Sequence, residues 1–146
     1  MKFIKLFIIT LLFSTINTFA QSASEILDKG FDYYHNGNYS AAVDCFRIAA
    51  EQGDVRAQYW LGGCYYFGVG VEQNYTEAVI WYRKAAEQGQ TIAQSLFQIA
   101  AQNSLGNCYY NGYGIDRNYT EAVKWYRKAA DQGLAMAQYL LGSWYV

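Results

Sequence analysis

The sequence predicts an all-α fold, a right-handed α/α solenoid of antiparallel helix pairs. The 146 residues contain no proline and 13 glycines at regular spacing, a composition typical of helices joined by short turns. Residues 57–89 match residues 101–133 at a shift of 44, with 23 identities in 33 positions, and a third copy starts at Leu134. An internal repeat of this length with apolar residues at helical spacing predicts stacked helix pairs.

The composition narrows the class of protein. Hydrophobic residues make up 53% of the chain and aromatic residues 18%, which excludes an intrinsically disordered protein. The 11 basic residues against 12 acidic ones give a formal charge of −1, so the charge balance argues against a nucleic-acid partner.

Residues 1–20 have the pattern of a secretory signal peptide. Lys2 and Lys5 supply the positive charge, residues 6–16 are mostly apolar, and Thr18-Phe19-Ala20 places small residues around a cleavage site. The apolar stretch is shorter than the roughly 18 residues that a membrane helix needs. An uncleaved N-terminal anchor is the alternative. We therefore expect a mature chain that starts at Gln21, has no membrane span, and is periplasmic or secreted.

Each repeat is predicted to fold into two antiparallel helices. In the first helix, Ala57, Leu61, Cys64 and Tyr65 share one stripe at helical spacing, and Gly68 breaks the helix. Small residues on such a stripe let helix axes approach, and aromatic residues fill the space that remains.

The second helix carries its own start and stop signals. Asn74 stands as the N-cap with Glu77 three residues further on, which is capping-box spacing. Gly89 ends the helix, where a left-handed residue is favoured. The buried stripe between them consists of Ala78, Trp81, Tyr82, Ala85 and Ala86.

The spacing of these residues resembles two related repeat families. The segment Gly30-x2-Tyr33-x3-Gly37-x-Tyr39-x2-Ala42-x3-Phe46-x2-Ala49 has tetratricopeptide spacing. The segments Leu61-Gly62-x2-Tyr65-Tyr66-x-Gly68-x-Gly70-Val71 and Tyr75-x2-Ala78-x2-Trp81-Tyr82-x-Lys84-Ala85-Ala86-x-x-Gly89 resemble the Sel-one-like repeat (SLR), a tetratricopeptide relative with a longer loop between its helices. Leu105-Gly106, Tyr109-Tyr110 and Trp125-Tyr126 repeat the SLR pattern. The resemblance implies a tetratricopeptide/SLR superhelix.

The predicted organisation has five parts. Residues 1–20 form the signal peptide, 21–53 a tetratricopeptide-like repeat, 54–89 an SLR repeat, 90–133 an SLR repeat with an extended first helix, and 134–146 a truncated SLR repeat or capping helix.

Two features depart from the repeat pattern. The second SLR unit has eight extra residues, and if these extend its first helix they rotate the helix phase by about 80°, so Leu96, Phe97 and Ile99 cannot continue the usual stripe. At the C-terminus, Leu140 and Leu141 lack the polar face of a capping helix. This leaves three alternatives: fuller packing of that helix, contact with a partner (self-association included), or a longer array.

The three cysteines are predicted to be free, buried thiols. Cys64 and Cys108 take equivalent positions in successive first helices, and Cys45 takes the position of Trp81 and Trp125 in the second helices. Equivalent positions in neighbouring repeats lie about 8–10 Å apart. That exceeds the about 4.4–6.8 Å between Cα atoms that a disulfide allows.

No group of residues in the sequence predicts a catalytic, metal or cofactor site. His35, the only histidine, has no companions at metal-ligand spacing, and its place near a helix end explains it. The sequence contains no Ser-x-x-Lys nucleophile motif and no phosphate-binding glycine pattern. We therefore expect no metal, no cofactor and no enzymatic activity.

The candidate binding residues lie opposite the buried stripe of the first helices. With Ala57 at zero, the stripe centres at about 20°, whereas Tyr66 lies at about 180° and Tyr59 at about 200°. Core packing does not explain aromatic rings at these angles, so we predict that they bind a partner on the concave face. The predicted partner-binding residues are Tyr34, Tyr59, Tyr66, Asn103, Asn107, Tyr110 and Tyr139.

The resemblance to SLR proteins implies an adaptor role. We expect an exported scaffold that binds a protein or peptide partner through the concave face of the solenoid. The alternative function is a secreted binder of cell-wall fragments or β-lactam-like ligands with weak hydrolytic activity, which a screen for turnover of those compounds would detect.

Overall fold

The computed structural model describes residues 3–4, 21–88 and 92–144. The predicted signal peptide lies outside these ranges apart from residues 3–4, as do the helix end predicted at Gly89 and the last two residues. Between residues 23 and 144, the described part of the chain forms seven helices and no strand, which confirms the all-α fold. The helices are α2 (Ala23–His35), α3 (Tyr39–Glu51), α4 (Val55–Phe67), α5 (Tyr75–Glu87), α6 (Ile92–Asn111), α7 (Tyr119–Asp131) and α8 (Ala135–Trp144).

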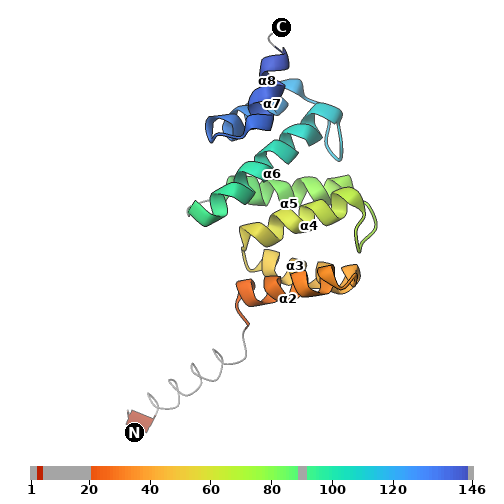
Figure 1. Cartoon of the computed structure of the whole chain (residues 1–146), viewed down its shortest axis with the longest axis vertical. Helices are drawn as coiled ribbons and strands as arrows, with labels where there is room; N and C mark the ends of the chain where they lie inside the picture. Colours follow the sequence, from red (N-terminus) through yellow and green to blue (C-terminus); the bar gives the residue numbers. More distant parts are fainter. Residues whose placement is uncertain (1–2, 5–20, 89–91, 145–146) are drawn as a thin grey trace.

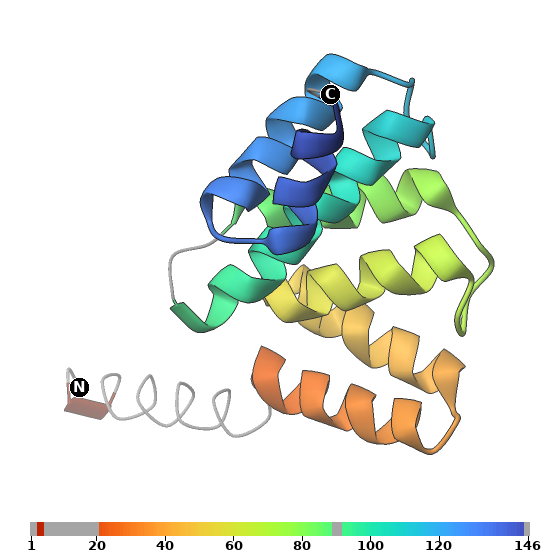
Figure 2. The same ribbon diagram turned by 45° about the horizontal axis from the view of Figure 1, so that its top comes forward.

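The helices stack as pairs along the long axis of the molecule (Figure 1). The pairs α2/α3, α4/α5 and α6/α7 each pack closely, each pair contacts the next, and α8 packs on α7. In Figure 1 the first helices α2, α4 and α6 lie on the near side, and Figure 2 shows the same order of helices after a 45° turn. We call the surface formed by α2, α4 and α6 the first-helix face. None of the described helices is both long and apolar enough to cross a membrane.

Side-chain caps fix where the helices start. The Oδ1 atom of Asn74 accepts a hydrogen bond of 3.1 Å from the backbone N–H of Glu77, and Asn118 makes the same bond at 3.0 Å. This confirms asparagine as the N-cap of both SLR second helices. The reciprocal bond of a full capping box forms at Ser22, whose backbone N–H donates to Glu25 at 3.2 Å.

A ring of the second helix packs against a glycine of the first helix in each pair. A Cβ atom added to any of these glycines would lie 2.7–2.8 Å from the facing ring. Only a residue without a side chain fits there, so the two helix axes approach closely. The three glycine–ring pairs are Gly30–Phe46, Gly62–Tyr82 and Gly106–Tyr126.

The loop inside each SLR unit packs on the preceding repeat. Gly70 and Gly114 have φ angles of 69° and 68°, in the left-handed region. A Cβ atom on Gly70 would lie 2.3 Å from the backbone of Tyr39, and one on Gly114 would lie 2.2 Å from the backbone of Tyr75. Tyr113 stacks on Tyr75 with 4.7 Å between ring centroids. These loops therefore need glycine for both its backbone conformation and its lack of a side chain.

Buried glutamines join each SLR unit to the helix pair before it. Gln58 is 2% exposed and donates from Nε2 to the backbone carbonyl of Ala50 at 3.2 Å, and Gln102, 4% exposed, bonds to Ala86 in the same way. Gln88, the C-cap of α5, donates in turn to the side chain of Gln58 at 3.1 Å. This role was not predicted, although an Ala-Gln pair recurs in each copy of the repeat.

The extra residues of the second SLR unit lie in α6, which has 20 residues where α4 has 13. Leu96 is 71% exposed, and Phe97 packs on Tyr59 with 5.9 Å between ring centroids. The expectation for Ile99 is wrong, because Ile99 is 9% exposed and takes in α6 the buried position that Val55 has in α4. The extension therefore adds a surface above α4 and buries part of it against the preceding repeat.

The three cysteines are unpaired, but only two are buried. Burial raises the pKa of the Cys64 thiol to about 11 and that of Cys108 to about 12. The expectation that Cys45 is also buried is wrong. Cys45 is half-buried near Lys29, in the terminal helix pair, which packs against one neighbouring pair where inner pairs have two. His35 is exposed in the last turn of α2, near a helix end as the sequence predicts.

Candidate functional site

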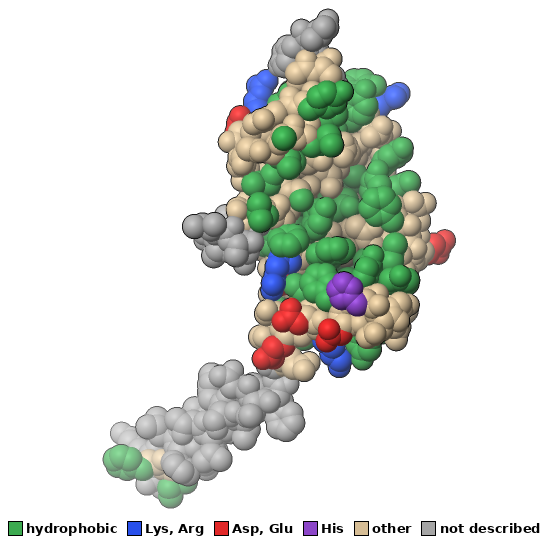
Figure 3. All heavy atoms as spheres, in the orientation of Figure 1, with side chains coloured by type: hydrophobic (Ala, Val, Ile, Leu, Met, Phe, Trp, Pro, Cys, Tyr) green, Lys and Arg blue, Asp and Glu red, His purple; other side chains and the backbone are tan. Residues whose placement is uncertain are grey.

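Two adjoining hollows open on the first-helix face, with volumes of about 310 and about 280 Å³. They share Tyr59, Phe67 and Tyr82, so they form one depression, which we call the aromatic groove. Figure 3 shows hydrophobic side chains gathered on this face over α4 and α6. The aromatic groove is lined by Tyr34, Tyr59, Trp60, Gly63, Cys64, Tyr66, Phe67, Val69, Tyr82, Ser104 and Asn107.

Four of the seven predicted partner-binding residues line the aromatic groove, namely Tyr34, Tyr59, Tyr66 and Asn107. The other three line neither hollow. Tyr110 is 39% exposed with its ring edge-on to Tyr119, and Tyr139 is 71% exposed on α8. The Oδ1 atom of Asn103 is buried without a hydrogen-bond partner among the described residues, so solvent does not reach it.

Tyr66 has a packing role that contradicts the helical-wheel argument. Its ring lies 5.1 Å from Tyr75, 6.0 Å from Tyr113 and 6.4 Å from Tyr82, measured between centroids. Burial raises the pKa of its hydroxyl above the ordinary value. The inference that core packing does not explain this ring is therefore wrong, because the loop of the next repeat folds over it.

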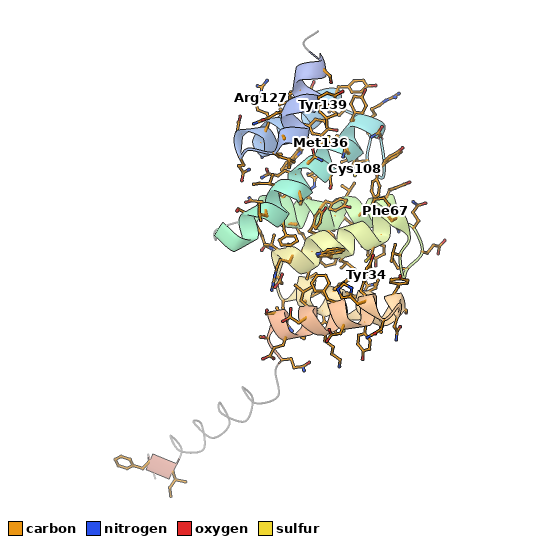
Figure 4. All side chains as sticks on the ribbon, in the orientation of Figure 1. Tyr34, Phe67, Cys108, Arg127, Met136 and Tyr139 are labelled. Carbon is orange, nitrogen blue, oxygen red and sulfur yellow. The ribbon has the colours of Figure 1, made fainter. Side chains whose placement is uncertain are left out.

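Two prominent groove residues, Trp60 and Phe67, were not predicted. Phe67 is 71% exposed at the C-terminal end of α4, and Trp60 is half-buried against Phe31 and Tyr34. Figure 4 shows Tyr34 between α2 and α4 and Phe67 at the end of α4. The sequence did hold a signal, since the equivalent positions 104 and 111 in the second SLR unit are serine and asparagine. Three aromatic residues of the groove, Tyr59, Trp60 and Phe67, therefore lie at positions where the second SLR unit has a polar residue.

The aromatic groove carries polar groups among its rings, and some of them interact within the chain. Burial raises the pKa of the Tyr82 hydroxyl well above its ordinary range, an effect that the nearby Ser104 side chain partly offsets. The hydroxyl of Tyr126 donates to Oδ1 of Asn107, which fixes the orientation of that amide. The indole nitrogen of Trp60 is buried and has no hydrogen-bond partner among the described residues. A ligand of this groove would therefore be held mainly by apolar and aromatic contact.

No charged side chain lines the aromatic groove. A third hollow, of about 310 Å³, is lined by residues of α7 alone and includes charged side chains such as Glu121 and Lys128. Lys128 lies 4.1 Å from the ring centroid of Trp125 there. Among the described residues, no three acidic, histidine or cysteine side chains lie close enough together to hold a metal ion.

Comparison with known proteins identifies the repeat. A family model described as the Sel1 repeat matches residues 25–54, 55–90, 99–134 and 135–146. A search of curated proteins finds no match.

Solved structures of other repeat proteins resemble the chain. Protein c5321, described as a protective antigen of uropathogenic Escherichia coli strains with an SLR fold, is 36% identical over 84% of this chain, with a TM-score of 0.74. A Sel1 repeat protein from Oxalobacter formigenes is 39% identical over 80% of the chain, with a TM-score of 0.69. Cysteine-rich protein B of Helicobacter pylori is 25% identical over 68% of each chain, with a TM-score of 0.58. The chain spans 26% of the length of c5321 and 45% of the Oxalobacter protein.

Proposed function

The chain belongs to the Sel1 repeat family, and we propose that it is an exported scaffold that binds an extended protein segment in the aromatic groove. Sel1 repeat proteins are generally scaffolds for protein interactions and are typically non-catalytic. The observation that carries the proposal is the exposure of Phe67, 71% exposed beside Trp60 and Tyr59 in an uncharged hollow. Neither Phe67 nor Trp60 is required by the repeat pattern.

The shape and chemistry of the groove favour an apolar or aromatic side chain on the bound segment. The first hollow has a volume of about 310 Å³ and is lined by residues that include Tyr34, Trp60, Gly63 and Phe67. Tyrosine and tryptophan at binding surfaces give a large contact area for little loss of conformational entropy. A segment laid along the first-helix face would place one such side chain in each hollow.

Export is supported by the N-terminal sequence. Residues 1–20 combine Lys2 and Lys5 with an apolar stretch and the Thr18-Phe19-Ala20 site. Sequencing the N-terminus of the protein recovered from its native envelope and culture medium tests this. A chain that starts at Gln21 supports export, and retention of residues 1–20 contradicts cleavage.

The groove is tested by selecting peptides from a random displayed library on the purified chain and measuring their affinities. Phe67→Asn introduces the residue that the second SLR unit has at position 111. Because Phe67 is largely exposed, this change should preserve the fold. It should weaken the affinity of the selected peptides for the chain by about tenfold or more.

Ile80→Lys is the matched control. Ile80 is 42% exposed on α5, outside the aromatic groove, and its equivalent in the second SLR unit is Lys124. Peptides that bind the wild type and Ile80→Lys equally, but bind Phe67→Asn weakly, support the aromatic groove as the binding site. The proposal is contradicted if no peptide is enriched, or if Phe67→Asn binds the peptides as tightly as the wild type.

A further inference from the structure

The two hollows of the aromatic groove lie on either side of α4. The first is lined by Tyr34 of α2 together with residues of α4, and the second by residues of α4 together with Ser104 and Asn107 of α6. Tyr59 and Phe67 of α4 line both hollows. A bound segment that fills both hollows therefore crosses α4 and follows the line of first helices, where Figure 3 shows hydrophobic side chains over α4 and α6.

The spacing of the hollows limits the conformation of such a segment. Side chains of α2 and α4 pack together, with 6.0 Å between the ring centroids of Tyr34 and Trp60. Side chains of α4 and α6 do the same, with 5.9 Å between Tyr59 and Phe97. Packed helices lie about 8–10 Å apart, so the centres of two hollows on either side of one helix are separated by about the same distance.

Among the regular backbone conformations, polyproline II has the repeat that matches this spacing. Its residues i and i+3 point to the same side and lie about 9.3 Å apart. In a β-strand the residues that share a side follow each other at about 6.6–6.8 Å, so the next two places are too near and too far.

Hydrogen-bond donors in the groove favour an extended backbone over a helix. The hydroxyl groups of Tyr34 and Tyr59 make no hydrogen bond to another residue in the described part of the chain, so they are available to donate. A polyproline II segment has no internal hydrogen bonds, and its carbonyls can accept from such groups. An α-helix uses its carbonyls internally and offers few acceptors along its side.

The lining of the groove suits a flat, uncharged side chain. None of the described residues that line either hollow is charged. Trp60 stands edge-on to Phe31 and Tyr34, with 5.3 and 6.0 Å between ring centroids, so its ring is held in place before anything binds. Grooves lined by aromatic rings bind proline-rich segments well, because the polyproline II conformation is already formed and loses little entropy on binding.

We propose that the aromatic groove binds a proline-rich segment of a partner protein in the polyproline II conformation, with two prolines three positions apart and one in each hollow. The segment is of the form Pro-x-x-Pro. In this conformation the two residues between the prolines point away from the hollows, so the prolines and their spacing carry the recognition. This inference rests on the proposed function, because it names the kind of segment that the groove holds.

Three labelled synthetic peptides test the spacing when they are titrated with the purified chain and followed by fluorescence anisotropy. They have the same composition, two prolines among alanine, glycine and serine, and differ only in having one, two or three residues between the prolines. The peptide with two residues between them should bind about fivefold more tightly, or better, than the other two. Replacing either proline of that peptide with alanine should weaken binding as much, because one hollow stays empty.

Tyr59→Phe tests the contact with the peptide backbone, since it removes a hydroxyl group and keeps the ring. It should weaken binding of the Pro-x-x-Pro peptide by about threefold or more. Tyr139→Phe is the matched control, because it makes the same change at a residue that lines neither hollow, and it should bind like the wild type. Circular dichroism should show the same helix content in both variants.

Equal affinities for the three spacings would overturn the proposal, as would an unchanged affinity of Tyr59→Phe. A further outcome separates this inference from the proposed function. If no proline peptide binds at about 1 mM, while peptides selected from the random library bind and depend on Phe67, the groove holds another kind of segment and only the proline inference is overturned. If neither set of peptides binds, both proposals are overturned.

Discussion

The side-chain amide of Gln58 in α4 donates a hydrogen bond of 3.2 Å to the backbone carbonyl of Ala50, near the end of α3. The bond crosses the junction between two repeats and is buried. The equivalent bonds are Gln102 to Ala86 at 3.4 Å and Gln138 to Ala130 at 3.1 Å. A hydrogen bond is directional, so the same bond at successive junctions fixes the rotation of each helix pair relative to the next. Apolar contacts alone specify this rotation less closely.

Gln58→Leu should lower the free energy of unfolding by about 1–2 kcal/mol, because its bonds to Ala50 and Gln88 are lost in a buried place. Gln138→Leu removes the equivalent bond from an exposed residue and should cost less than about 1 kcal/mol. Urea denaturation of the two variants measures both values. Equal costs would show that burial does not determine the strength of this contact.

Gly114→Ala should destabilise the chain more than Gly133→Ala. Both glycines have positive φ, 68° and 95°. An alanine in this left-handed conformation lowers the stability by roughly 1–2 kcal/mol, so both substitutions carry this cost. Only at Gly114 would the new Cβ atom also collide with backbone, that of Tyr75 at 2.2 Å. Thermal unfolding of both variants tests this, and similar melting temperatures would mean that the loop does not pack on the preceding repeat as described.

Tyr66→Ala should lower the free energy of unfolding by about 2 kcal/mol, since the ring packs among Tyr75, Tyr82 and Tyr113. Phe67→Ala, at the neighbouring and 71% exposed position, should change it by less than about 0.5 kcal/mol. Chemical denaturation of the pair separates the packing role of one ring from the exposure of the other. If Tyr66→Ala leaves the stability unchanged, the Tyr66 ring is a surface residue with no packing role.

Stability should fall at alkaline pH because of the buried thiols. Cys64 and Cys108 titrate at about 11 and about 12 in the folded chain, whereas an unburied thiol has a value of 9.0. Above that value the unfolded chain releases these protons and the folded chain keeps them, so stability present below pH 9 is lost as the pH rises through 11.

Urea midpoints measured from pH 8 to pH 11 check this titration. The double variant Cys64→Ala and Cys108→Ala should be less stable at pH 8 but should lose less stability over the same range. A parallel decline in both proteins would mean that other groups cause the alkaline loss.

The helices and their starts could be predicted from the sequence because they depend on local residues. Asn74 and Asn118 cap the helices that follow them directly, and the shift of 44 between copies revealed the extra residues that lie in α6. The role of Gln58 could not be predicted, since it depends on how the end of α3 approaches α4 in space.

The candidate site was predicted in part for a related reason. A helical wheel for α4 places Tyr59 on the open face, and that residue does line the aromatic groove. The same wheel cannot show that Tyr113, 47 residues after Tyr66, folds over that ring. Phe67 was missed because the helical wheel selected only residues opposite the buried stripe, whereas Phe67 lies at about 280°, on the flank of the helix.

The central claim is that the first-helix face binds the partner segment, and the most direct test is to map a selected peptide on the chain by amide chemical shifts in solution. We predict shift changes concentrated in residues 59–67 of α4 and 104–107 of α6, the segments that supply lining residues of the aromatic groove. Changes concentrated on the exposed sides of α5 and α7, with those groove residues unperturbed, would contradict the claim.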